Sequence, residues 1–129
     1  MKVHIGRYPK KEGLERKVSV KIDPFDTWNM DYTLALIIHP MLIQLKENAH
    51  GAPRVDDEDV PDELKSTAST EPKKHEWEPD STWHSRWDWV LDEMIWTFGQ
   101  IIVGDWREYN ARIENGLRLF GRYYRGLWD

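Results

Sequence analysis

Two short segments of the chain carry residue types suited to binding a phosphorylated ligand that contains an aromatic ring. Arginine and aromatic residues alternate over residues 83–87 and again over 118–123. Guanidinium groups bind phosphates through forked N–H donors, and aromatic rings stack on nucleobases. An ordinary amphipathic helix surface is the simpler alternative. The candidate ligand-binding residues are Trp83, Arg86, Trp87, Arg118, Arg122 and Tyr123.

Two acidic clusters have the oxygen ligands that a hard cation prefers. Residues 56–63 contain six carboxylates but lack the spacing and the glycine of an EF-hand. We interpret them as a solvated acidic loop. Asp88, Asp92 and Glu93 could hold a divalent ion in a helical nucleotide hydrolase. Because that chemistry needs facing acidic pairs on several helices, ion pairing with Arg86, Arg118 or Arg122 is the alternative.

Other catalytic signatures are missing from the sequence. The chain has no cysteine, and it contains no nucleophile elbow, P-loop or dinucleotide fingerprint. Its five histidines share no metal-ligand spacing, and His39 in an apolar segment is typical of a core histidine. We therefore predict no catalytic residues, no metal and no cofactor, and the protein is not expected to be an enzyme.

The composition predicts a single domain that associates with itself. The 129 residues include eight tryptophans, more than so small a core can bury. Some should therefore lie at a subunit interface or line a pocket, which predicts a homo-oligomer. A net charge of −5 argues against binding to nucleic acid or to an anionic membrane. Residues 1–22 nevertheless contain seven basic and two acidic residues.

Hydrophobic periodicity predicts a mainly α (α+β) fold. Alternating apolar residues over 2–8 and 17–22 indicate a β-hairpin within residues 1–22. Residues 26–48 are predicted to form a central apolar helix, which Asp26 or Thr27 caps and which Pro40 kinks or divides near Ile37.

The second half of the chain is predicted to end in two packed helices. Residues 50–80 are predicted to form a long surface connection, with a short helical turn from Pro61 and a flexible stretch over 65–80. Residues 81–103 and 105–127 show helical spacing and form a predicted helical hairpin, with Gly104 ending the first helix. Trp89 and Trp96 form a second stripe beside the apolar face, which indicates a second packing partner.

Four sequence blocks resemble a family of uncharacterised small proteins encoded by tailed bacteriophages. They are DTWNMDYTLALIIHPMLIQLKE (26–47), HGAPRVDDEDVPDELKSTA (50–68), RWDWVLDEMIWTFGQ (86–100) and NGLRLFGRYYRGLWD (115–129). Many family members carry additional residues between the two C-terminal helices, where this chain has only IIVGDWREYNARIE. The family has no established activity. The resemblance therefore implies a viral origin and the host bacterial cytoplasm, but no reaction.

These observations support three hypotheses of function. The first is a counter-defence protein that sequesters a small nucleotide immune signal, of the cyclic nucleotide or ADP-ribose type, without catalysis. The second is an interaction or virion-associated protein that binds a host macromolecule through its acidic loop and tryptophans. The third is the metal-dependent nucleotide hydrolase. No membrane association is expected, because the apolar run over 34–45 is too short to span a bilayer.

Overall fold

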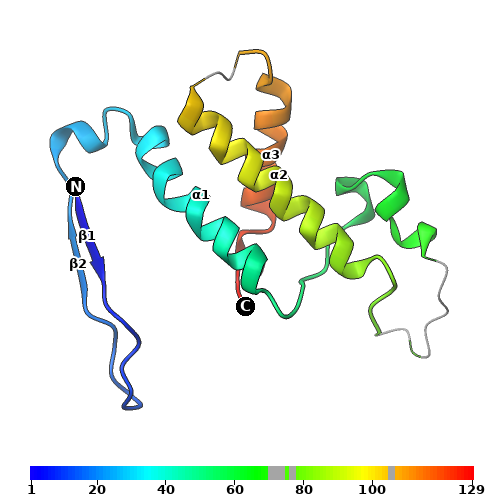
Figure 1. Ribbon diagram of the computed structural model, residues 1–129, viewed down its shortest axis with the longest axis horizontal. Coiled ribbons are helices and arrows are strands. Elements are labelled where there is room, and N and C mark those ends of the chain that lie inside the picture. Colours follow the sequence, from blue (N-terminus) through cyan, green and yellow to red (C-terminus); the bar gives the residue numbers. More distant parts are fainter. Residues whose placement is uncertain (70–74, 76–77, 105–106) are drawn as a thin grey trace. The chain divides into compact units, whose positions relative to one another are not determined.

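The computed structural model describes residues 1–69, 75, 78–104 and 107–129 (Figure 1). The protein is mainly α-helical, with one small antiparallel hairpin, as predicted. Its contacts divide the chain into two compact units, Met1–Leu34 and Ala35–Asp129, where the sequence predicted one domain. Among the described residues, no helix has the length and apolar character needed to cross a membrane.

The N-terminal unit contains the predicted hairpin, here called the arm (residues 1–22). Strand β1 (Lys2–Ile5) pairs antiparallel with β2 (Val18–Lys21), so both strands are shorter than predicted. Opposite residues share a face, and side chains alternate along each strand. One face of the arm is therefore apolar and the other polar. The apolar face consists of Val3, Ile5, Val18 and Val20.

A 3-10 turn, η1 (Pro24–Asp26), separates the arm from the first helix. Asp23 is the N-cap of this turn, and the Asp26 carboxylate completes the capping box by accepting a hydrogen bond of 2.8 Å from the backbone N–H of Asp23. Thr27, the other cap predicted for the long helix, is the C-cap of the same turn. The expectation that Asp26 caps the long helix is thus wrong. Helix α1 (Met30–Asn48) begins four residues later than predicted and continues through Pro40 without being divided. The predicted kink stays a prediction.

The segment after α1 that contains residues 55–69, here called the turn segment, is more ordered and more buried than predicted. It forms three 3-10 turns, η2 (Asp57–Asp59), η3 (Asp62–Leu64) and η4 (Ser66–Ala68). The predicted turn after Pro61 is confirmed as η3. Val55, Asp59 and Val60 are buried, so a surface connection is the wrong description of this part. Part of the stretch predicted to be flexible, residues 70–74 and 76–77, lies outside the described residues.

Helices α2 (Trp83–Val103) and α3 (Asn110–Arg122) form the predicted antiparallel pair. Gly104 ends α2 with a φ of 81° and donates its N–H to the Gln100 carbonyl at 2.9 Å, as expected of a C-cap glycine. Helix α3 is shorter than the predicted 105–127. Its last predicted residues form a separate 3-10 turn, η5 (Tyr124–Gly126), and residues 105–106 lie outside the described part of the chain.

The two helices are in tight contact at a glycine of α3. A Cβ atom added to Gly116 would lie 1.8 Å from Oγ1 of the buried Thr97 on α2. Only a residue without a side chain fits this crossing. The core of the C-terminal unit combines this helix pair with α1 from Ala35 onward and with the turn segment; its buried members include Ala35, Leu42, Val55, Val60, Trp87, Val90, Leu91, Met94, Phe98 and Leu119.

Candidate functional site

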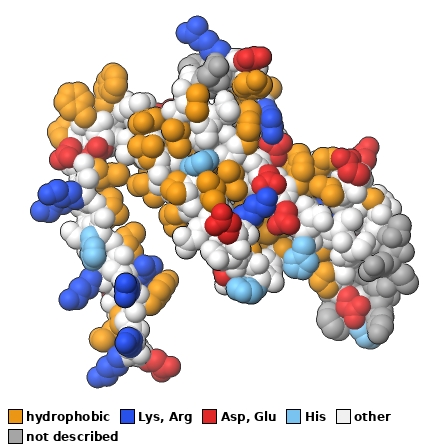
Figure 2. All heavy atoms as spheres, in the orientation of Figure 1, with side chains coloured by type: hydrophobic (Ala, Val, Ile, Leu, Met, Phe, Trp, Pro, Cys, Tyr) orange, Lys and Arg blue, Asp and Glu red, His pale blue; other side chains and the backbone are white. Residues whose placement is uncertain are grey.

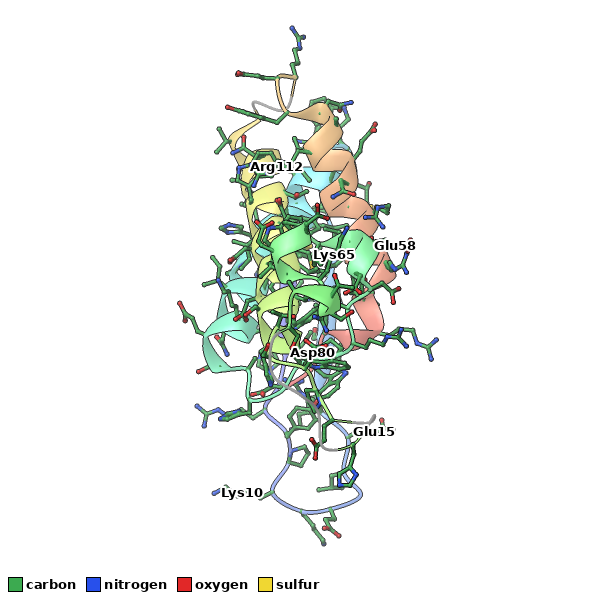
Figure 3. The ribbon with its side chains drawn as sticks, turned by 90° about the vertical axis from the view of Figure 1, so that its right-hand side faces the viewer. Lys10, Glu15, Glu58, Lys65, Asp80 and Arg112 are labelled. Atoms are coloured by element: carbon green, nitrogen blue, oxygen red, sulfur yellow. The ribbon has the colours of Figure 1, made fainter. Side chains whose placement is uncertain are left out.

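The first three candidate residues belong to a network at the start of α2. Arg86 is 3% exposed. Its two terminal nitrogens donate to the Asp80 carboxylate at 3.0 and 2.8 Å, and one of them also donates to Thr82 Oγ1 at 2.7 Å and to the Leu64 carbonyl at 3.1 Å. Chiefly through the hydrogen bond from Arg86, the pKa of Asp80 is lowered to about 2. The Arg86 guanidinium therefore links Leu64 and Asp80 to helix α2. Figure 3 labels Asp80.

The two tryptophans of this group are also structural anchors. Trp83 donates its indole N–H to the Ala52 carbonyl at 2.9 Å. Trp87 is 1% exposed and meets Tyr123 edge to face, with ring centroids 6.2 Å apart. In this arrangement neither the Arg86 guanidinium nor the Trp87 ring is open to an external ligand. The sequence signal that selected them, alternating arginine and indole, is equally typical of a buried anchor.

The other three candidate residues converge on one buried carboxylate, that of Asp59. Tyr123 donates its hydroxyl to Asp59, and Arg118 and Arg122 approach the same carboxylate at 2.8 and 3.1 Å. The Tyr123 hydroxyl also accepts the backbone N–H of Asp56 at 3.1 Å. Burial, followed by the hydrogen bond to Asp59, raises the pKa of Tyr123 to about 12.

Arg122 extends this network across the surface of the turn segment. It pairs with Asp56, whose hydrogen bond raises the pKa of Arg122, and with Glu58 at 3.0 Å. In Figure 3, Glu58 lies beside the ribbon of α3. Within the acidic loop, Asp56, Glu58 and Asp59 are thus paired with α3, whereas Asp62 is 93% exposed, so the prediction of a solvated loop is correct only in part. The Asp59 carboxylate lies in the protein interior, and α3 supplies two guanidinium groups that pair with it.

The same acidic residues form the metal-type cluster found within the described residues. Ligand oxygens of Asp56, Glu58 and Asp59 all lie within 4.8 Å of one another. Arg122 contacts all three carboxylates and so provides their counter-charge. An ion at this position would have to displace the guanidinium.

The acidic residues of α2 have partners other than those expected. Asp92 pairs with Lys46 of α1, and Glu93 pairs with Arg112 of α3 at 3.0 Å. Arg112 reaches from α3 across to α2 (Figure 3). The expected partners, Arg86, Arg118 and Arg122, are all bound to the turn segment or to Asp80. Asp92 and Glu93 therefore form ion pairs that link α2 to α1 and to α3.

An apolar groove lies between the C-terminal half of α1 and the end of the chain. Its cavity has a volume of about 370 Å³. A second hollow of about 380 Å³ shares Met41 and Leu45 with it and has Gln44, Asn48 and Asp129 at its rim. Sequence reasoning missed this site, although apolar residues on several sides of α1 were its signal. The groove is lined by Ile38, Met41, Leu42, Leu45, Phe120, Tyr124 and Leu127.

The N-terminal unit exposes apolar side chains along its whole length. Phe25 and Trp28 are 81% and 82% exposed. Figure 2 shows hydrophobic side chains along the arm and at the turn before α1, beside the basic side chains of the arm. By contrast, the predicted tryptophan stripe on α2 is partly covered within the chain, since Arg112 stacks 3.8 Å from the Trp96 ring and Tyr109 meets that ring edge to face.

No protein-family model, curated protein or solved structure matches this chain. Membership of the phage protein family therefore stays a prediction from the sequence blocks.

Proposed function

We propose that this protein is a non-enzymatic interaction protein that acts as a homo-oligomer. The observation that carries the proposal is the exposed apolar surface of the N-terminal unit. Exposed apolar patches of this kind are typical of interaction sites, because leaving them in water costs free energy. The exposed residues include Val3, Ile5, Val18, Val20, Ile22, Phe25, Trp28 and Met30.

The charged residues of the C-terminal unit support binding rather than chemistry. The arginines selected as candidates are each paired with a carboxylate of the same chain. Charges fixed in this way stabilise the fold and leave few groups free to move a proton or to hold a substrate. Arg118 and Arg122 also neutralise part of the acidic loop, which weakens its attraction for a basic partner surface.

The proposed partners are further copies of the chain and, in addition, a host macromolecule. Phe25 and Trp28 are suited to the second role, since exposed aromatic residues are common anchors at protein interfaces. If the resemblance to phage proteins holds, the site of action is the host bacterial cytoplasm.

Sedimentation velocity of the full chain tests the proposal. At micromolar concentration we expect a mass that is a multiple of 15.4 kDa. Replacing Phe25 and Trp28 together with serine should leave this mass unchanged if these rings serve a host partner. A single species of 15.4 kDa at all concentrations would contradict the proposal.

Sequestration of a nucleotide signal is a second candidate, supported by two partly exposed arginines, Arg118 and Arg122, that lie beside Tyr123 around Asp59. The two arginine side chains are 46% and 38% exposed. A phosphate would have to compete with Asp56 and Asp59 for them, so the ligand-bound state requires the acidic loop to move away.

Thermal shift measurements with cyclic di- and trinucleotides and with cyclic ADP-ribose isomers test this second candidate. We expect stabilisation by one of these ligands and its loss in Arg122→Gln. Arg125→Gln is the matched control, because Arg125 lies on the same segment of chain outside the Asp59 network. No shift with any of these ligands would exclude them as cargo.

A further inference from the structure

We propose that the apolar face of the arm of one copy docks in the α1 groove of a second copy, and that the exchange is reciprocal. The inference rests on the proposed self-association and assigns its interface. Two observations support it. The hairpin has an exposed apolar face and a net positive charge, and the groove is lined by apolar side chains in the part of the chain that has a net negative charge.

The arm is a two-stranded hairpin with an exposed apolar face. Val3, Ile5, Val18 and Val20 share one face, and they are 46–63% exposed. The opposite face carries Lys2, His4, Ser19 and Lys21 instead. A two-stranded ribbon is marginally stable in water by itself, so burial of its apolar face would supply the missing stabilisation.

The charges of the chain favour a contact between the arm and the rest of another copy. The arm has seven basic and two acidic residues, whereas residues 23–129 have eleven basic and 21 acidic residues. Two arms packed together would bring like charges into one interface. An arm packed on the acidic part of a second copy joins opposite charges.

The groove matches the arm in apolar character and in length. It is lined by apolar side chains, and its neighbouring hollow adds the Asp129 carboxylate to the rim, where a basic arm residue would find a counter-charge. A four-residue strand is about 13 Å long. The lining of α1 from Ile38 to Leu45 spans about 10 Å along the helix. One strand pair therefore covers the groove.

Reciprocal exchange also gives a closed assembly. Each copy offers one arm and one groove, so two copies related by a two-fold axis satisfy both. The same arm–groove contact then occurs twice, and no apolar arm face is left over to recruit a third copy. We therefore expect a dimer.

Engineered disulfides test this contact cleanly, because the native chain has no cysteine. We propose to mix Val20→Cys with Met41→Cys under mild oxidation and to identify the linked peptides by mass spectrometry. Val20 lies on the apolar arm face, and Met41 lines the groove and is 67% exposed. Ser19→Cys mixed with Met41→Cys is the matched control, since Ser19 is the strand neighbour on the opposite face.

We expect a covalent dimer that links positions 20 and 41, at several-fold higher yield than the control pair and with lower yield at high salt. Equal yields from both pairs would overturn the inference. Efficient linkage of Val20→Cys with itself would overturn it in favour of paired arms. In a separate double variant that carries both Val20→Cys and Met41→Cys, an intramolecular link would overturn exchange between copies.

The sedimentation mass separates the two proposals. An oligomer without a preferred link between positions 20 and 41 overturns the arm and groove contact and leaves self-association intact. A monomer overturns both.

Discussion

Trp28 and Trp87 show how differently the two units of this protein treat the same side chain. Trp28 in the N-terminal unit is 82% exposed, whereas Trp87 on α2 is 1% exposed. Helix α2 has α3 packed against it, with Gly116 in tight contact with Thr97. The arm has an equally clear apolar face and nothing within its unit to cover it. An amphipathic pattern therefore predicts which side chains form an apolar face. Whether that face is buried depends on whether a second element packs against it.

The largest change in the free energy of unfolding is expected at Trp87, and a much smaller change is expected at Trp28. Trp87→Ala should lower the free energy of unfolding by about 4 kcal/mol, because it removes a fully buried ring and its contact with Tyr123. Trp28→Ala is the control and should change it by less than about 0.5 kcal/mol in the monomer. Urea titration followed by circular dichroism measures both. Similar losses in the two variants would refute the contrast.

The buried ion pair of Asp80 and Arg86 should rank next. Asp80→Asn keeps the shape but leaves the Arg86 guanidinium buried without its counter-charge, which should cost about 3 kcal/mol of unfolding free energy. Asp62→Asn is the matched control. Its carboxylate is 93% exposed and pairs with Lys65 at the surface, so no measurable change in stability is expected.

Acid titration of the same variant gives a second readout. The pKa of Asp80 is about 2 in the folded protein against 3.8 ordinarily, so its stabilising contribution is complete above pH 3.8 and is lost as the pH falls toward 2. The stability difference between the wild type and Asp80→Asn should therefore shrink across this window. A difference that stays constant would show that the charge of Asp80 is not its source.

The helix crossing provides a smaller but more local test. Gly116→Ala places a methyl group against Thr97 and should cost about 2 kcal/mol, since the helices must separate to admit it. Gly121→Ala on the same helix has open space around the added carbon and should be neutral or slightly stabilising. Thermal unfolding of both variants makes the comparison, and a stable Gly116→Ala would mean that the crossing is loose.

The Tyr123 hydroxyl should have the smallest effect of the four. Tyr123→Phe removes its hydrogen bond to Asp59 and should cost about 1.5 kcal/mol at neutral pH. The pKa of Tyr123 is raised from 10 to about 12, so the neutral form stabilises the fold below pH 10 and this contribution is lost between pH 10 and 12. Tyr124→Phe, at an exposed neighbour, should keep the alkaline loss that Tyr123→Phe abolishes.

The regular elements were predictable because their signals are local. Val3, Ile5, Val18 and Val20 alternate as a strand requires, and the structure pairs them in one hairpin. Helix α2 appears within two residues of its predicted start. The ends of α1 and α3 were less well predicted: Asp26 belongs to a 3-10 turn instead of capping the helix, and α3 ends at Arg122.

The roles of the candidate residues were far less predictable. Arg86 and Trp87 were selected as ligand contacts, and the structure gives both of them internal contacts. Asp59 was assigned to a solvated loop and is buried beside Tyr123. A residue type specifies which bonds a side chain can form, but an internal carboxylate and an external phosphate satisfy arginine equally well.

The order of residues alone determined where the strands and helices form, that the arm is amphipathic, and that it is basic while the rest of the chain is acidic. These properties depend on neighbours a few positions away. Only the tertiary structure decided which charges are paired and which apolar faces are covered, because such contacts join distant segments. The hydroxyl of Tyr123 and the carboxylate of Asp59 are 64 positions apart, and no periodicity in the sequence links them.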